Sequence, residues 1–466
     1  MLHFLMIIGS LHAQPTLPNS VADALVQAQV PSQAFSGYLA RVDQSQPTWA
    51  WQADTIRQPA SLMKLLTTYL GLRHLGSQYR WETPIYTLGV RDKTRWNGQV
   101  YLVGQGDPTL TRERLWAWLW AWRQQGIREW GGEVIIDRQW LDEPSMDPNA
   151  FDGAGTRPYN VVADALPLQF NALRFTFQPN TRGEVDVLSD PPANPHLSIT
   201  SHLQANTKPC NRDWDDALYV DRQAEQLHLR GEYPLACGKR DWYVSPFSHR
   251  HWANHYLPAV WESLGGVWQA TIRDGTRPTT LGSPSEILRS PPLAEIVRDM
   301  NKFSNNLIAR QLFLSLAPPP TRTEKATQVA HTWLQQHGLH FPELVLENGA
   351  GLSRREQITP SHLAQLLQQA WYSPVMPEFV ASLPIAGQDG TLKQRLPTTN
   401  GSLRLKTGVL ANVRGLAGYL QDTQGHWWVV VGLINHPQAH AARPALDAFM
   451  QWALQTANQK ALESVP

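Results

Sequence analysis

The stretch SLRLKTGVLANVRGLAGYLQDTQGHWWVVVGLI, residues 402–434, determines the fold that we predict for this chain. It holds three strand-like segments, at 402–409, 414–421 and 427–434, which are separated by turn residues. Connections this short join strands that run antiparallel. A helical pattern of apolar residues follows at 446–454 and would pack back on the sheet. We therefore predict an antiparallel meander with a C-terminal helix, as part of an α+β fold.

The N-terminal part of the chain completes the same domain in our interpretation. A helix is predicted from Ala60 through Leu72, with Pro59 before it and Gly76 after it. Residues 285–372 also have a helical pattern, interrupted by three consecutive prolines. We therefore assign residues 20–82 and 262–466 to one α+β domain, an antiparallel sheet flanked by helices together with a helical region.

The middle of the chain, residues 83–261, has a different pattern of apolar and turn residues. Short alternating runs bounded by turn residues predict strands there, and they lie at 99–103, 132–137, 174–178 and 184–188. Because these runs are separated from the flanking helical patterns, we interpret 83–261 as a β-rich insertion. We expect it to consist of two modules.

A helix predicted near 112–125 interrupts the insertion and carries four tryptophans. The i,i+4 spacing pairs Trp116 with Trp120 and Trp118 with Trp122, so the indole rings line two faces of the helix. We favour core packing or a contact between domains for these rings. A ligand-stacking surface is the alternative.

The overall composition excludes several classes of function. The chain has 466 residues, 42% of them hydrophobic, and 40 basic against 39 acidic side chains give a formal net charge of +1. This composition is globular, and it lacks the basic clusters that nucleic-acid binding requires. Apart from the N-terminus, the longest apolar run is 427–434, which is too short to cross a bilayer. We expect neither a nucleic-acid partner nor a transmembrane segment.

Two features predict export. Residues 1–13 contain a short apolar run that ends in a small residue, Ala13, which is typical of a secretory signal peptide. The only two cysteines are Cys210 and Cys237. In an exported chain such a pair most simply forms one disulfide, whereas two buried free thiols are the alternative. We expect a periplasmic or otherwise exported protein.

Three short motifs contain candidate catalytic residues. The first is Ser61-Leu62-Met63-Lys64, at the start of the predicted helix. The i,i+3 spacing puts the hydroxyl and the amine on one face, one turn apart. A serine here has an unpaired backbone amide and the positive helix end beside it, and both favour an oxyanion. A neutral Lys64 could take the proton of Ser61. The alternative is an N-capping serine and a solvated lysine.

The second motif is Ser304-Asn305-Asn306, in a turn between two helical runs. The hydroxyl of Ser304 could relay a proton and the amide of Asn306 could hold a substrate carbonyl, although a polar turn needs no function. The third motif, Lys406-Thr407-Gly408, ends an apolar strand. Its glycine lets a substrate backbone approach, and Lys406 and Thr407 offer donors to a carboxylate.

In this order and context the three motifs resemble those of β-lactamases and penicillin-binding proteins. Within that superfamily, surrounding stretches are similar to the D-alanyl-D-alanine carboxypeptidase/endopeptidase family, peptidase S13, also called penicillin-binding protein 4-like or class C low-molecular-mass. These stretches are 106–110, 300–302, 348–354, 383–387, 389–392 and 414–418. The resemblance covers nearly the whole chain and includes the long insertion between the first two motifs. It implies a serine β-lactamase/DD-transpeptidase-like domain.

The resemblance implies a role for each motif residue. Ser61 is expected to attack the peptide carbonyl and to become an acyl-enzyme, with Lys64 as its general base. Ser304 and Asn306 would complete the proton relay and hold the substrate backbone, and Lys406 would be their electrostatic partner. Thr407 would meet the terminal carboxylate of the substrate, and Gly408 would keep the strand open to it. The oxyanion would be bound by the backbone amides of Ser61 and Val409.

One departure from the family concerns Val409, where relatives usually carry serine or threonine. The lost hydroxyl would help to grip a terminal carboxylate, which favours endopeptidase or weak carboxypeptidase activity. The expected substrates are peptidoglycan stem peptides, cleaved at D-Ala-D-Ala or at D-Ala-meso-diaminopimelate cross-links, and β-lactam antibiotics are the expected inhibitors. We expect no metal and no organic cofactor.

Three alternatives stay open. A serine β-lactamase of class A would need a glutamate in a Glu-x-x-Leu-Asn motif, which the sequence lacks after the second motif. A non-catalytic wall-binding protein would not need the Ser61–Lys64 pair. A metalloenzyme is suggested by His249, His251 and His255, but no acidic residue stands at the expected interval, so surface or capping histidines are favoured.

Overall fold

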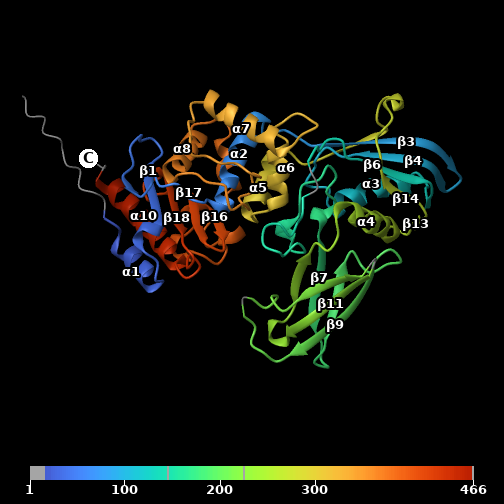
Figure 1. The fold of residues 1–466 in the computed structure, drawn as a ribbon, viewed down its shortest axis with the longest axis horizontal. Coiled ribbons are helices and arrows are strands. Elements are labelled where there is room, and N and C mark those ends of the chain that lie inside the picture. Colours follow the sequence, from blue (N-terminus) through green and yellow to red (C-terminus); the bar gives the residue numbers. More distant parts are fainter. Residues whose placement is uncertain (1–15, 144–145, 212, 224–225, 464–466) are drawn as a thin grey trace, which may run out of the picture.

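The computed structural model describes residues 16–143, 146–211, 213–223 and 226–463. The molecule is elongated and has two lobes (Figure 1). The main lobe comprises residues 16–81 and 290–463, and the accessory lobe comprises 82–289. The predicted signal peptide, residues 1–13, lies outside the described residues.

A five-stranded antiparallel sheet forms the centre of the main lobe. The three C-terminal strands form the predicted meander, and the N-terminal strand β1 adds to it beside β18, with Phe35 opposite Ile434. The α+β class is therefore confirmed. In sheet order the strands are β16 (Leu403–Leu410), β17 (Val413–Gln421), β18 (Trp427–Asn435), β1 (Phe35–Arg41) and β2 (Trp49–Trp51).

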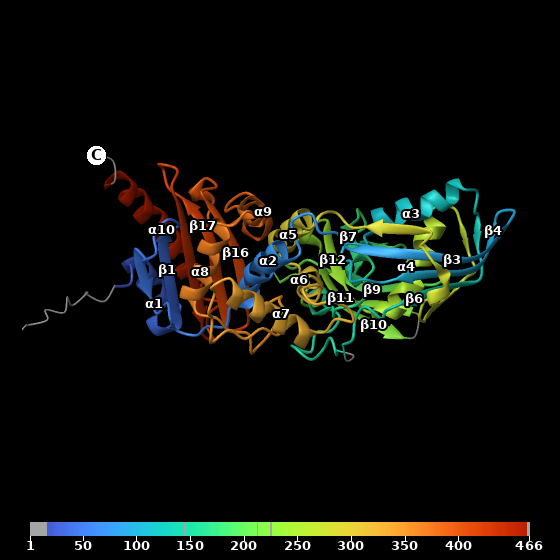
Figure 2. The ribbon, with the colours of Figure 1, turned by 90° about the horizontal axis from the view of Figure 1, so that it is seen from above.

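Helices cover both faces of this sheet (Figures 1 and 2). α1 and α10 pack on the outer face through a core that includes Phe35, Phe449 and Trp428, while α2 and α8 lie on the inner face. The helices of the main lobe are α1 (Asn19–Gln27), α2 (Met63–His74), α5 (Leu293–Lys302), α6 (Asn306–Leu314), α7 (Thr323–Gln336), α8 (Pro360–Trp371), α9 (Met376–Ser382) and α10 (Arg443–Glu463).

The central helix α2 is enclosed by other elements. All residues from Met63 through Leu72 are buried, because α5, α6, α7, α8 and α9 surround the helix. A short 3₁₀ turn, η2 (Ala60–Leu62), precedes it and packs against β16 and β17. The sequence places only apolar or small side chains and threonines around most of α2, so the buried Lys64 is conspicuous.

The accessory lobe contains a seven-stranded sheet that α3 and α4 cover (Figure 2). Trp118 and Trp122 of α3 are buried in its core, which confirms core packing for that helix face, whereas Trp116 and Trp120 are exposed. The elements are β3 (Glu82–Asp92), β4 (Arg95–Val103), α3 (Arg112–Gln124), β5 (Glu129–Trp130), β6 (Glu133–Asp137), α4 (His249–Ser263), β13 (Val267–Trp268), β14 (Thr271–Asp274) and β15 (Glu286–Arg289).

Two three-stranded sheets complete the accessory lobe and pack on each other through aromatic side chains such as Phe177, Tyr233 and Trp242. The disulfide Cys210–Cys237 links two segments of this module, so the predicted pairing is confirmed. The strands are β7 (Leu173–Pro179), β8 (Val185–Asp190), β9 (Ser198–Asn206), β10 (Tyr219–Gln223), β11 (Gln226–Pro234) and β12 (Arg240–Val244).

The boundary of the insertion needs revision. Strands β13, β14 and β15 follow residue 262, yet they pair with β5, β6 and β3 of the accessory lobe. We propose that the inserted region ends at Arg289 rather than at 261, and that its two modules are the seven-stranded sheet with its helices and the pair of three-stranded sheets. Within the ranges that the structure describes, no helix is both long and apolar enough to cross a membrane.

Candidate active site

Ser61 lies in a sharp turn that the sheet and a neighbouring loop hold in place. Ala60 adopts a left-handed conformation, with φ of 50°, so that the chain turns abruptly into η2. Two glycines make room for this turn. A Cβ atom on Gly351 would stand 1.9 Å from the carbonyl oxygen of Ala60, and one on Gly408 would stand 2.7 Å from that of Pro59. The third motif and the loop at 348–354 therefore both pack closely against the turn that carries Ser61.

Lys64 lies one helical turn after Ser61 and is completely buried. Its Nζ atom donates to Ser61 Oγ over 3.1 Å, to Asn306 Oδ1 over 2.7 Å and to the carbonyl oxygen of Ala350. Burial lowers the pKa of Lys64 well below its ordinary value, and the nearby Lys406 lowers it further. The lowered pKa favours the neutral amine, whose two N–H groups suffice for Asn306 and Ala350, so that its lone pair can accept the proton of Ser61.

The second motif lies in the connection between α5 and α6. Ser304 adopts a left-handed backbone conformation, with φ of 57°. The side chain of Asn305 caps α6 by accepting from the backbone amide of Ile308 over 3.0 Å. Asn306 is buried. Its Nδ2 atom donates over 3.0 Å to the carbonyl oxygen of Tyr159 in the accessory lobe, so this side chain lies where the two lobes meet.

The third motif brings a second lysine to the site. Lys406 is buried on β16, and its Nζ atom donates over 2.9 Å to Ser304 Oγ and over 2.9 Å to the carbonyl oxygen of Thr407. Burial lowers the pKa of Lys406 to about 7. Thr407 donates to the hydroxyl of Thr391 over 3.1 Å, whereas Val409 is 56% exposed.

The predicted residues therefore converge into two linked serine–lysine pairs, Ser61 with Lys64 and Ser304 with Lys406. Asn306 binds Lys64 and so joins the second motif to the first. Each pair places a hydroxyl within 3.1 Å of an amine whose pKa is lowered. Such an arrangement can withdraw a proton from one oxygen and return it to another atom.

Two ionisable residues beside the site were not predicted. Glu356 is buried and accepts hydrogen bonds from the backbone amides of Glu347 and Asn348, which shape the loop that ends at Gly351. Burial raises the pKa of Glu356, and its charge opposes the lowering of the Lys64 pKa. Arg310, one helical turn after Asn306, is also buried, and burial lowers its pKa to about 10.

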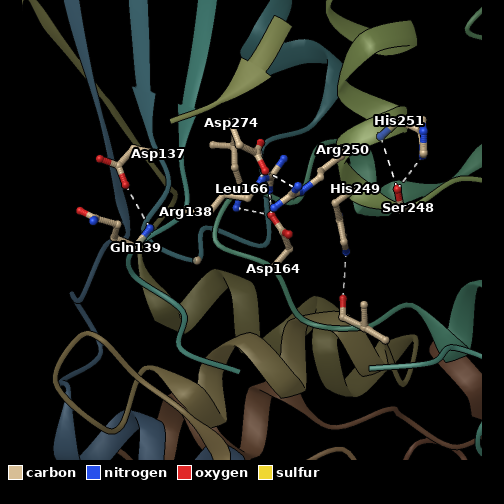
Figure 3. Close-up of polar contacts among 12 residues, drawn as sticks. Asp137, Arg138, Gln139, Asp164, Leu166, Ser248, His249, Arg250, His251 and Asp274 are labelled. Atoms are coloured by element: carbon tan, nitrogen blue, oxygen red, sulfur yellow. Dashed lines mark hydrogen bonds and ion pairs between the residues drawn. The ribbon is translucent and has the colours of Figure 1, made fainter. Parts of the chain in front are cut away.

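The accessory lobe fixes the loop that meets Asn306 and Arg310. Arg310 donates to the carbonyl oxygens of Asn160 and Val161, which follow Tyr159 in that loop. Figure 3 shows the anchoring network at the far end of the loop, where Arg138 bridges Asp164 and Asp274 and where Arg250 also binds Asp274. The backbone contact to Asn306 is therefore held by ion pairs that belong to the accessory lobe.

The histidine pattern does not form a common ligand set. His249 contacts the carbonyl oxygen of Val162, His251 contacts the hydroxyl of Ser248 and His255 contacts the carbonyl oxygen of His196. Figure 3 shows His249 and His251 pointing in different directions. Among the residues whose positions are described, no group of three or more His, Cys, Asp or Glu side chains could hold a metal ion.

The chain is similar in sequence to known peptidases over most of its length. The family model described as D-Ala-D-Ala carboxypeptidase 3 (S13) matches residues 17–456. The D-alanyl-D-alanine carboxypeptidase DacB of Haemophilus influenzae is 24% identical over 438 residues, which are 90% of this chain and 89% of the relative. The D-alanyl-D-alanine carboxypeptidase of Actinomadura sp. strain R39 is 26% identical over 414 residues, which are 84% and 75% of the two chains.

Solved structures give the same fold. The structure of penicillin-binding protein 4 from Haemophilus influenzae superposes with a TM-score of 0.73 at 20% identity, and the match covers 92% of this chain and 98% of the other. A second structure of that protein, complexed with a β-lactam, has a TM-score of 0.69 at 20% identity, with 93% and 99% of the two chains covered. The whole two-lobed architecture, and not the main lobe alone, is therefore shared.

Proposed function

The chain belongs to the D-Ala-D-Ala carboxypeptidase 3 (S13) family, which confirms the resemblance seen in the sequence, and we propose that it is a serine DD-peptidase of peptidoglycan. Its substrates would be stem peptides, cleaved after the penultimate D-alanine at a free terminus or at a cross-link. The observation that carries this proposal is the hydrogen bonding of the buried Lys64 to both Ser61 and Asn306.

The proposed acylation begins with a proton transfer. Neutral Lys64 takes the proton of Ser61 while Ser61 Oγ forms a bond to the peptide carbonyl carbon. The developing oxyanion lies against the backbone amides of Ser61 and Val409. The C–N bond then breaks, and the amine leaves with the proton that Lys64 took from Ser61, relayed by the hydroxyl of Ser304, so that Lys64 is neutral again. Ser304 suits this relay because it already accepts from Lys406.

Hydrolysis of the acyl-enzyme repeats the same steps with water in place of the amine. Neutral Lys64 removes a proton from the water molecule, the water oxygen attacks the ester carbonyl, and Ser61 regains its proton as the ester bond breaks. Asn306 holds Lys64 in position for both halves of the reaction. The products are the shortened stem peptide and a regenerated serine hydroxyl.

The balance between the two peptidase activities would depend on the carboxylate end of the site. Lys406 and Thr407 are the donors that we assign to a terminal carboxylate, and Val409 adds no hydroxyl to them. We propose that endopeptidase activity is favoured. Replacing Val409 by serine should raise kcat/KM for a peptide ending in D-Ala-D-Ala about 3- to 10-fold, since one added hydrogen bond is worth about 1 kcal/mol. Cross-linked dimers would gain less.

The proposed setting is the periplasm or another space outside the cytoplasm. The Cys210–Cys237 disulfide supports this, because disulfides persist in oxidising compartments. The peptidoglycan that the enzyme would cleave lies in the same space. β-Lactam antibiotics would acylate Ser61 in place of the peptide.

The proposal is tested by intact mass after incubation with benzylpenicillin. We expect a stable adduct on the purified protein and none on Ser61→Ala. Ser373→Ala, a change just after the end of α8 and outside the three motifs, should keep the adduct. Absence of an adduct with intact drug would favour a non-catalytic wall-binding protein. Destruction of the drug without a lasting adduct would favour a β-lactamase.

A further inference from the structure

The outer face of α3 carries two exposed tryptophans that the proposed peptidase function does not use. The rings of Trp116 and Trp120 are 5.4 Å apart between centroids and are parallel to within 8°. They are 40% and 41% exposed, although Trp118 and Trp122 on the opposite face are buried. α3 lies at the periphery of the accessory lobe (Figure 2). Stacking fixes the orientation of both rings before any ligand arrives.

Trp116 forms one wall of a cleft of about 510 Å³ between α3 and the sheet of β7, β8 and β12. Tyr243 on β12, which is 49% exposed, forms another part of the wall. Gln169 also lines the cleft, and its side chain accepts from the backbone amide of Arg112 over 2.7 Å. The cleft therefore joins the two modules of the accessory lobe, and its lining is tied to the start of α3.

The charges in this cleft balance one another. Asp190 binds Arg112 over 2.7 Å and Arg174 over 3.0 Å, and Glu113 is the second carboxylate in the lining. Two guanidinium groups and two carboxylates leave no net charge, which disfavours a strongly ionic ligand. The same groups present planar donors and acceptors, fixed by their mutual ion pairs, at the edge of an aromatic surface.

We propose that this cleft, the α3 cleft, binds an N-acetylhexosamine unit of a peptidoglycan glycan strand, with the sugar ring stacked on Trp116. The C–H face of a pyranose fits the electron-rich face of an indole, and its hydroxyl and amide groups need the planar polar partners that Asp190 and the two arginines supply. A neutral polyhydroxylated ring matches the balanced charge. The inference rests on the proposed function, since the stem peptides of that substrate are attached to such a strand.

A second contact to the same polymer would act through effective concentration. When the α3 cleft holds the glycan, the attached stem peptides are tethered to the same protein molecule as Ser61, which raises their effective concentration at the proposed nucleophile. Soluble peptides without sugar would gain nothing. The α3 cleft should therefore affect the cleavage of whole peptidoglycan and leave the chemistry at Ser61 unchanged.

Direct binding is the first test, with the trimer of N-acetylglucosamine as the probe. Calorimetry and tryptophan fluorescence should detect binding to the purified protein. Trp116→Ala should weaken it at least tenfold, and Trp116→Phe should restore part of the affinity. Tyr219→Ala, which removes a 55% exposed aromatic ring from β10 of the same lobe, should bind like the unchanged protein. No binding to the unchanged protein, or equal binding by Trp116→Ala, would overturn the proposal.

The second test separates the α3 cleft from the catalytic site. Cleavage of isolated cell-wall sacculi should fall several-fold in Trp116→Ala, while benzylpenicillin acylation and the melting temperature stay unchanged. Equal loss on sacculi and on a soluble stem peptide would overturn the proposal, as would binding of a sugar-free peptide that competes with the trimer. If Ser61 is not acylated at all, the peptidase proposal fails, yet sugar binding can still be measured.

Discussion

The carbonyl oxygen of Tyr159 accepts a 3.0 Å hydrogen bond from the side-chain amide of Asn306, and this bond links the accessory lobe to the centre of the candidate active site. The other end of that amide, Oδ1, accepts from Lys64 over 2.7 Å. Because an amide has distinct donor and acceptor ends, the contact to Tyr159 fixes which atom faces the lysine. The accessory lobe thus orients a group that touches the proposed general base.

Replacing Asn306 by aspartate should therefore slow acylation at neutral pH. A carboxylate would lose the bond to Tyr159 and would raise the pKa of Lys64, so that less of the lysine is neutral. We expect acylation by benzylpenicillin at pH 7 to be about 10- to 100-fold slower, with partial recovery as the pH rises. Asn305→Asp is the matched control, since aspartate caps a helix as well as asparagine does. Equal loss in both variants would contradict this explanation.

The tight contact between Gly351 and the turn at Ser61 gives a second prediction. In Gly351→Ala the new Cβ would meet both the carbonyl oxygen of Ala60, at 1.9 Å, and the amide nitrogen of Ser61, at 2.7 Å. The turn must shift, and a displacement of about 1 Å at a reacting group can cost about 100-fold in rate. Stopped-flow acylation by benzylpenicillin would measure this loss.

The control for this variant is Gly338→Ala. Gly338 has a similar positive φ, 74° against 81° for Gly351, but a Cβ there would meet nothing within 4 Å. Both variants therefore carry the same kind of backbone strain, and only one disturbs Ser61. Acylation by Gly338→Ala should match that of the unchanged protein. A similar loss in both would show that strain alone, rather than contact with Ala60, is responsible.

The lowered pKa of Lys406 predicts a pH dependence. Lys406 is charged below about pH 7 and neutral above it, so an electrostatic role for its ammonium group is lost as the pH rises through 7. On the acidic side, kcat/KM should fall where Lys64 becomes protonated. In Lys406→Arg the charge persists at high pH, so the alkaline fall should move upward by several pH units. A profile of kcat/KM for a D-Ala-D-Ala peptide checks this, and an unchanged alkaline limb would exclude Lys406 as its source.

The sequence predicted those parts of the site that are local. The i,i+3 spacing of Ser61 and Lys64 and the strand position of Lys406 follow from periodicity, and the structure brings them together through the motifs themselves. Glu356 has no such signal. It is buried because the loop at 347–351 folds around it, and this tertiary arrangement cannot be recognised from spacing.

The contacts between the lobes could not be predicted from the sequence either. The contribution of Tyr159 is a backbone carbonyl, which any residue supplies, so its identity carries no information. The strands that follow residue 261 also have no sequence signal, because β13 and β14 have only two and four residues, too few for an alternating pattern. Their partners β5 and β6 lie more than a hundred positions earlier, and only the folded sheet shows the pairing.

The disulfide gives the last prediction, which concerns the stability of the accessory lobe. Cys210 and Cys237 are 27 positions apart, and closing a loop of that length in the unfolded chain is worth about 3.5 kcal/mol. Reduction should therefore lower the melting temperature of this lobe by roughly 10 °C. The Ser61–Lys64 pair lies in the main lobe, so acylation by benzylpenicillin at 25 °C should persist after reduction. Calorimetry with and without dithiothreitol would measure the shift. The double variant Cys210→Ser/Cys237→Ser should melt at the reduced temperature in both conditions, and a further shift of that variant with reductant would contradict the assignment to this bond.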